Sequence, residues 1–191
     1  MKDSIKKLYS IKKLYEEIEA SNKKFAKMDA AQKRVQIARD VLAQLKSGQF
    51  NAQSGAYVES SFVIPAKKLD LQLQEILPSV PKCNVCGIGS LFLCAVSRKD
   101  DITARDAIMG NYLDVDGDTA YDYLKKFFSK PQLTAIECAF EQTWGVAGAF
   151  AEDIDDDNER LRLIMENIIV NKGTFVPKNK PVWTVIGNPI P

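Results

Sequence analysis

The chain has 191 residues, of which 46% are apolar and 27% are charged, and its formal net charge is +1. This composition is typical of a globular protein with a sizeable core and excludes a disordered chain. The sequence contains no histidine, which excludes imidazole general bases, Ser-His-Asp triads and histidine-ligated metals. No apolar stretch reaches the ~18 residues of a membrane span, and the N-terminal sequence does not resemble a signal peptide. We therefore expect a cytoplasmic protein with no membrane partner.

Charge is distributed unevenly along the sequence. Residues 1–50 carry 12 Lys and Arg against 6 Asp and Glu, whereas residues 101–166 carry 6 against 15. In most proteins such charge belongs to solvated helix faces. The alternative is that the basic segment lies on the acidic one, in the same chain or in a second copy.

The first half of the chain predicts two helices and a strand. Residues 3–20 place apolar side chains at steps of three and four, the narrow stripe of an amphipathic helix. A break is expected at Ser21, and Asp29 and Gly48 have the residue types that begin and end a second helix. The β-prone residues 57–64 predict a short strand or a small hairpin.

The second half predicts further helices around one apolar segment. Residues 82–97 are apolar around nearly the whole helical circumference, as in a helix at the centre of a bundle. Other helices are expected at 69–77, 102–109, 118–128, 131–140 and 161–169, and a loop is expected at 110–117.

These elements predict a mainly α fold. We expect a single-domain helical bundle with a small β element and an N-terminal helical arm. The arm comprises residues 1–28, and residues 29–191 form the single mainly helical domain.

The four cysteines raise the question of a metal site. Cys83 and Cys86 have zinc-knuckle spacing, and without histidine the remaining ligands would be Cys94, Cys138 or nearby carboxylates. Cysteines in an apolar helix are more often small core residues, which favours buried thiols over zinc or a redox pair. Cys83 and Cys86 remain the candidate metal ligands, and we expect no cofactor.

Nucleotide and nucleic-acid binding receive little support. The sequence has neither a phosphate-binding P-loop nor a dinucleotide-binding glycine motif. Glutamates interrupt the basic N-terminal segment, whereas proteins that bind phosphate backbones usually present a cleaner positive face. The sequence therefore argues against nucleic acid as a partner.

Three segments are similar to segments of small uncharacterised proteins of bacterial and phage genomes. The first is Pro-Lys-Cys-Asn-Val-Cys-Gly-Ile-Gly-Ser-Leu-Phe at 81–92, and the others are residues 38–42 and 171–177. The resemblance implies that the cysteine pair recurs in a fixed apolar helix and that the chain comes from a phage or mobile element. It implies no activity.

The sequence favours a non-enzymatic protein that acts by binding another protein. The candidate interaction residues are the apolar stripe of the arm and an acidic run before the last helix: Ile5, Leu8, Ile11, Tyr15, Asp153, Asp155, Asp156 and Asp157. A homo-oligomer with residues 1–20 in its interface is expected. The alternatives are a small enzyme or ligand-binding protein with an Asp/Glu/Lys/Tyr site, and a zinc-stabilised structural module.

Overall fold

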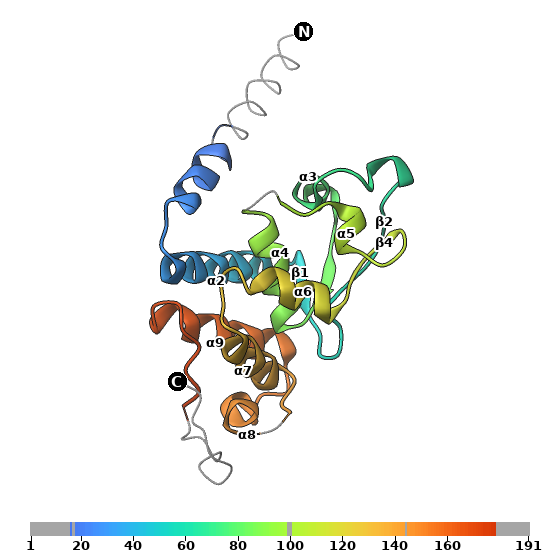
Figure 1. The fold of residues 1–191 in the computed structure, drawn as a ribbon. Helices are drawn as coiled ribbons and strands as arrows, with labels where there is room; N and C mark the ends of the chain where they lie inside the picture. Colours follow the sequence, from blue (N-terminus) through green and yellow to red (C-terminus); the bar gives the residue numbers. More distant parts are fainter. Residues whose placement is uncertain (1–15, 17, 99–100, 144, 179–191) are drawn as a thin grey trace, which may run out of the picture.

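A computed structural model describes residues 16, 18–98, 101–143 and 145–178 (Figure 1). The described part of the chain is mainly helical and contains a small four-stranded sheet. A helix over 18–26 comes first. The other α-helices are α2 (Ala30–Ser47), α3 (Leu73–Ile76), α4 (Gly87–Val96), α5 (Ala104–Ala107), α6 (Gly117–Leu124), α7 (Lys130–Phe140), α8 (Gly145–Gly148) and α9 (Asp157–Val170). The strands are β1 (Phe50–Ala52), β2 (Val58–Val63), β3 (Cys83–Val85) and β4 (Tyr112–Val115).

The sheet has the strand order β1-β3-β2-β4 and two chemically different faces. β1 and β3 are parallel, whereas β2 runs antiparallel to both β3 and β4. Val58 lies opposite Val85 and Val115, and all three valines are buried. Successive side chains of a strand point to opposite faces. The neighbouring Glu59, Asn84 and Asp114 therefore share the other face.

Helix α4 is the centre of the core. All of its residues from Gly87 to Val96 are buried, and it contacts α2, α6 and α7. A central position for this segment was expected from its apolar composition and is confirmed. Its predicted start at residue 82 is wrong, because Cys83–Val85 forms strand β3 and Cys86 is the N-cap of α4. A short apolar run does not distinguish a buried strand from a buried helix.

Local signals located some elements accurately and missed others. α2 begins after the side chain of Asp29, which accepts a hydrogen bond from the Gln32 backbone, and it ends at Gly48 in the left-handed region. The loop expected at 110–117 is wrong, because β4 pairs there with β2. The helix that follows β4 begins at Gly117, one residue earlier than expected, with Asp116 as its N-cap, and it ends at Leu124 instead of residue 128.

The second half of the proposed arm packs on the rest of the protein. The helix over 18–26 continues through Ser21, where we expected a break. Phe25 is only 3% exposed, and its ring centroid lies 6.1 Å from that of Phe127. Ser21 accepts a hydrogen bond from Arg98, which also pairs with Asp40. Residues 22–28 thus contribute to the same hydrophobic core as α2 and α6.

Part of the predicted interaction surface lies outside the described residues. This applies to Ile5, Leu8, Ile11 and Tyr15, and with them to most of the apolar stripe of the arm.

We predict that Phe92→Ala lowers the free energy of unfolding by about 3–5 kcal/mol, the range for removing a buried aromatic side chain. Phe92 is fully buried, and its ring packs edge-on against Tyr123 at a centroid distance of 5.4 Å. Urea denaturation followed by circular dichroism measures the change. Val170→Ala is the control, because Val170 is 78% exposed, and it should stay within about 0.5 kcal/mol of the parent protein. If Phe92→Ala lowered the free energy of unfolding as little as Val170→Ala does, α4 would lie outside the core.

Candidate functional site

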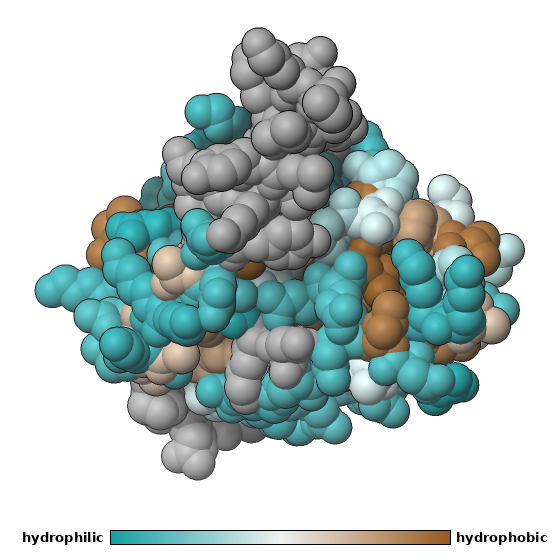
Figure 2. Space-filling view, turned by 90° about the horizontal axis from the view of Figure 1, so that it is seen from above, coloured by the Kyte–Doolittle hydropathy of each residue, from teal (hydrophilic) through white to brown (hydrophobic). Residues whose placement is uncertain are grey.

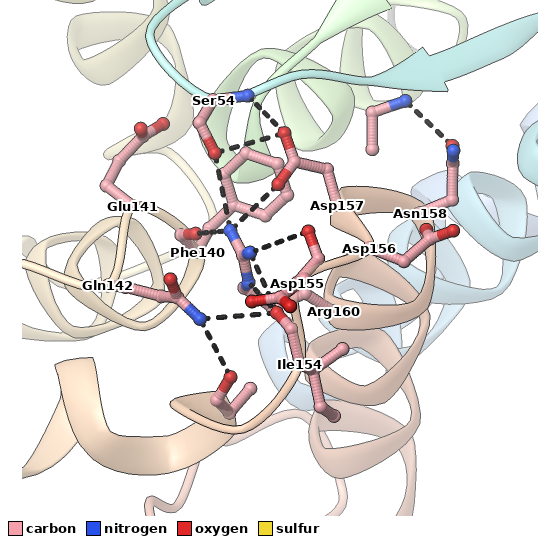
Figure 3. Close-up of polar contacts among 12 residues, drawn as sticks. Ser54, Phe140, Glu141, Gln142, Ile154, Asp155, Asp156, Asp157, Asn158 and Arg160 are labelled. Atoms are coloured by element: carbon pink, nitrogen blue, oxygen red, sulfur yellow. Dashed lines mark hydrogen bonds and ion pairs between the residues drawn. The ribbon is translucent and has the colours of Figure 1, made fainter.

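The connection between β1 and β2 is held by the side chain that follows the last residue of α7 and by side chains at the start of α9 (Figure 3). Asp157 accepts hydrogen bonds from the backbone N–H of Ser54 at 2.6 Å and from its hydroxyl at 3.1 Å. Glu141 accepts from the backbone N–H of Gly55 at 2.9 Å, and Asn158 accepts from Ala52 at 2.9 Å. Residues 53–57, called here the clamped loop, are therefore fixed to two helices that are distant in sequence.

Arg160 is the centre of the network drawn in Figure 3. Only 4% of this residue is exposed. Its guanidinium donates to the carbonyls of Phe140 at 2.7 Å and Ile154 at 2.8 Å, and it pairs with Asp157 at 2.9 Å. A buried charge needs an opposite charge and several hydrogen bonds to be tolerated. Arg160 thereby ties the end of α7 and the segment before α9 to the clamped loop.

A second polar cluster joins two tyrosines to one carboxylate. The hydroxyls of Tyr57 and Tyr121 donate to the two oxygens of Glu137, in the case of Tyr121 at 2.6 Å. Burial and these hydrogen bonds raise the pKa of both tyrosines. Burial also raises the pKa of Glu141, one turn further along the chain. The tyrosines remain protonated at neutral pH, so neither can act as a general base there.

Tyr57 is seated between the first turns of α4 and α6. Its carbonyl accepts the backbone N–H of Cys86 at 3.2 Å. A Cβ atom at Gly89 would lie 1.5 Å from this carbonyl oxygen, and one at Gly117 would lie 2.5 Å from the Tyr57 ring. Both glycines are therefore required for the close approach. The hydrogen bonds around Arg160, those around Glu137 and this close contact all hold the clamped loop against the core. They indicate that the loop has a structural role.

The cysteines occupy different elements of the core. Cys83 lies in β3, Cys86 caps α4, and both are buried. Burial raises the pKa of Cys83 to about 11 and that of Cys86 to about 12. A cysteine binds a metal ion as the thiolate. The buried surroundings of Cys83 and Cys86 favour the protonated thiol. Within the described ranges, no three Cys, Asp or Glu side chains converge as a metal site would require.

The acidic run before α9 divides into internal and exposed residues. Asp156 caps α9 by accepting the backbone N–H of Glu159 at 3.0 Å. Asp157 belongs to the Arg160 network described above. Asp153 and Asp155 are exposed. Asp153, Asp155 and Asp156 are therefore all exposed, although Asp156 also caps α9, and Asp157 alone of the four belongs to an internal network.

The uncovered face of the sheet forms a groove of about 580 Å³. This surface, called here the open face, crosses β3, β2 and β4. Glu59 lies opposite both Asn84 and Asp114 in the strand registers. Met109 and Tyr112 line the same groove and are each 54% exposed.

Sequence reasoning did not find this groove. The signal was the alternation in Tyr112-Leu113-Asp114-Val115, whose exposed and buried positions follow the period of a strand. The sequence predicts a loop for these residues, and Glu59 and Asp114 become neighbours only through the pairing of β2 with β4.

Comparisons with models of protein families, with curated proteins and with solved structures found no match to this chain. In the described part of the structure, no helix combines the length and the apolar character needed to cross a membrane.

We predict that Arg160→Met lowers the free energy of unfolding by about 3 kcal/mol, because it leaves several buried carbonyls and Asp157 without their partner. Arg162→Met is the matched control on the same helix. Arg162 pairs with Glu159 and Glu166, but its side chain is 42% exposed, and exposed ion pairs contribute at most about 1 kcal/mol. Chemical denaturation of both variants gives the comparison. Similar losses in the two variants would contradict a clamping role for Arg160.

We also predict that alkylation of the folded protein by iodoacetamide at pH 8 modifies Cys138 before Cys83 and Cys86. Cys138 is half-buried, whereas the raised pKa values leave only a minute thiolate fraction at the other two. Mass spectrometry of peptides after timed quenching measures the order, and denatured protein provides the control in which all four react. Rapid labelling of Cys83 or Cys86 would show that the pair is accessible and reactive.

Proposed function

We propose that the protein is a non-enzymatic protein-binding protein and that its partner binds the open face of the sheet. The observation that carries this proposal is the exposure of Met109 and Tyr112 beside two carboxylates in the groove, with the exposed Val63 opposite Tyr112 in the strand register. Figure 2 shows apolar surface gathered on the right, the side where Figure 1 places α3, α5, β2 and β4. Exposed apolar groups that cluster beside polar ones are characteristic of interaction surfaces.

The chemistry of the open face defines the partner. Glu59 and Asp114 lie directly opposite one another on neighbouring strands, where like charges are destabilising. Lys82 also lines the groove, and a cationic side chain of a partner placed between the two carboxylates would reduce their repulsion further. Tyr112 and Met109 offer an amphipathic ring and an adaptable thioether to an apolar side chain. The expected partner is therefore a protein segment with a lysine or arginine next to an aliphatic or aromatic residue.

The enzyme and zinc hypotheses receive less support than protein binding. The tyrosines and glutamates that resemble an Asp/Glu/Lys/Tyr site have internal partners, and these partners fix the clamped loop. The two thiols with zinc-knuckle spacing have raised pKa values, and no third ligand lies beside them in the described chain.

We infer further that the chain forms one helical domain and that the protein is cytoplasmic. One hydrophobic cluster extends from Phe25 to Phe175, which supports a single helical domain over residues 29–191 with residues 22–28 packed on it. The free cysteines accord with a cytoplasmic location. Encoding by a phage or mobile element rests on the sequence resemblance alone.

The test uses fluorescent octapeptides and the full-length protein. Peptides that combine lysine with tyrosine and leucine should bind, whereas peptides with glutamate in place of lysine should not. Glu59→Lys and Tyr112→Ala should each weaken binding at least about tenfold, as expected when a charge pair or an interface aromatic is lost. Fluorescence polarisation measures the affinities.

Glu75→Lys provides the matched control, because it makes the same charge change at an exposed position of α3. It should leave the affinity unchanged. The proposal fails if no lysine-containing peptide binds, or if Glu59→Lys and Glu75→Lys bind the peptides equally.

A further inference from the structure

A second groove, of about 650 Å³, is lined by cations. It lies between the helix over 18–26, α2 and the C-terminal end of α9. Its charged walls contain Lys24, Lys27, Arg39 and Lys172, and Val35 and Ile169 supply apolar surface between them. We call it the basic groove.

The cations of the basic groove lack carboxylate partners among the described residues. Elsewhere in the structure, arginines such as Arg98, Arg105 and Arg162 form ion pairs with acidic side chains. Asp29 also lines the groove, but its carboxylate is engaged in capping α2. Positive charges held close together repel one another, so the groove is suited to an acidic ligand.

The same chain carries an acidic surface at the opposite end of α9. Glu152, Asp153 and Asp155 are exposed just before this helix begins. We call them the acidic corner. None of the three side chains forms an ion pair with another described residue. The acidic corner and the basic groove are therefore complementary in charge, and both lie at the surface.

Helix α9 keeps the two surfaces of one molecule apart. It has 14 residues, which corresponds to a length of about 21 Å. Its N-terminal end is fixed to β1 through Asn158, and its C-terminal end reaches the start of α2, where Gly173 approaches the carbonyl of Ala31. Figure 1 shows α9 lying along α2 between these ends. The acidic corner cannot reach the basic groove of its own chain.

We propose that the basic groove binds the acidic corner of a second copy of this chain. The contact is heterologous, because one copy contributes its groove and the other its corner. The copy that contributes its groove keeps a free acidic corner, and the copy that contributes its corner keeps a free basic groove. Further copies can therefore add head to tail. Ile154, half-buried between the acidic residues, offers an apolar side chain to the groove lined by Val35 and Ile169.

A second copy fits better than a nucleic acid. A polyanion would be repelled by the acidic corner and by the negative segment 101–166, whereas a second copy carries both charges in complementary positions. The open face is not involved, so this inference is independent of the proposed partner-binding function.

The experiment uses two charge-reversed variants of the full chain. The groove variant is Lys27→Glu with Lys172→Glu, and the corner variant is Asp153→Lys with Asp155→Lys. At low salt the parent protein should form oligomers whose size grows with concentration, and 0.5 M NaCl should dissociate them, because exposed charges are screened. Each variant alone should associate at least about tenfold more weakly.

Mixing the two variants gives the decisive measurement. Each variant retains one intact surface, so the mixture should recover the association that each variant alone has lost, beginning with a 1:1 heterodimer. Analytical ultracentrifugation measures the masses, and circular dichroism checks the fold of each variant. Lys67→Glu with Lys130→Glu makes the same charge change at other exposed positions and should associate like the parent. The neutral variant Lys27→Gln with Lys172→Gln provides a second test should the reversal disturb folding, and it should also weaken association.

Several results would overturn the proposal. A parent protein that stays monomeric at low salt and high concentration would do so, as would a mixture of the two variants that remains monomeric. Unchanged association of the groove variant would place the contact elsewhere. Binding of heparin by a monomeric parent protein, lost in the groove variant, would assign the groove to a polyanion instead.

Discussion

The complete burial of α4 is the constraint on which the rest of the structure depends. A helix that is apolar on every side is stable only when other elements surround it. The inner face of the sheet, α2, α6 and α7 supply this surrounding. The absence of a side chain at Gly89 lets the carbonyl of Tyr57 come into contact with the helix. This contact closes the turn between β1 and β2 onto the core and sets the position of β2, and with it the open face.

The buried polar chemistry of the protein is used to hold this arrangement. Arg160 and Asp157 fix the clamped loop from one side, and Glu137 fixes it from the other through Tyr57. Such groups would resemble an active site if only their residue types were considered. Because each has an internal partner, the groups that remain available to other molecules are at the surface. The open face, where Tyr112 and Met109 are exposed, is one such surface.

Sequence patterns predicted the elements that depend on local interactions. Asp29 and Gly48 bounded α2 correctly because capping is decided within one turn of the chain. β3 and β4 were not predicted because an alternation over three or four residues is too short to identify a strand, and both strands depend on pairing with β2. The polar clusters could not be predicted, since Tyr57, Tyr121 and Glu137 meet only after folding. The acidic run at 153–157 is evident in the sequence. Which of its residues caps α9 and which pairs with Arg160 depends on where the helix begins.

Helix α9 converts the charge asymmetry of the sequence into an asymmetry of the molecule. In an unfolded chain the basic first segment and the acidic later segment could neutralise one another. The contacts of α9 with α2 and β1 keep the acidic corner at one end of this helix and the basic groove at the other. Exposed charges are screened beyond about 10 Å at moderate salt. The attraction between the two ends is therefore too weak to act within one molecule, and in the proposed association it acts between two molecules in contact.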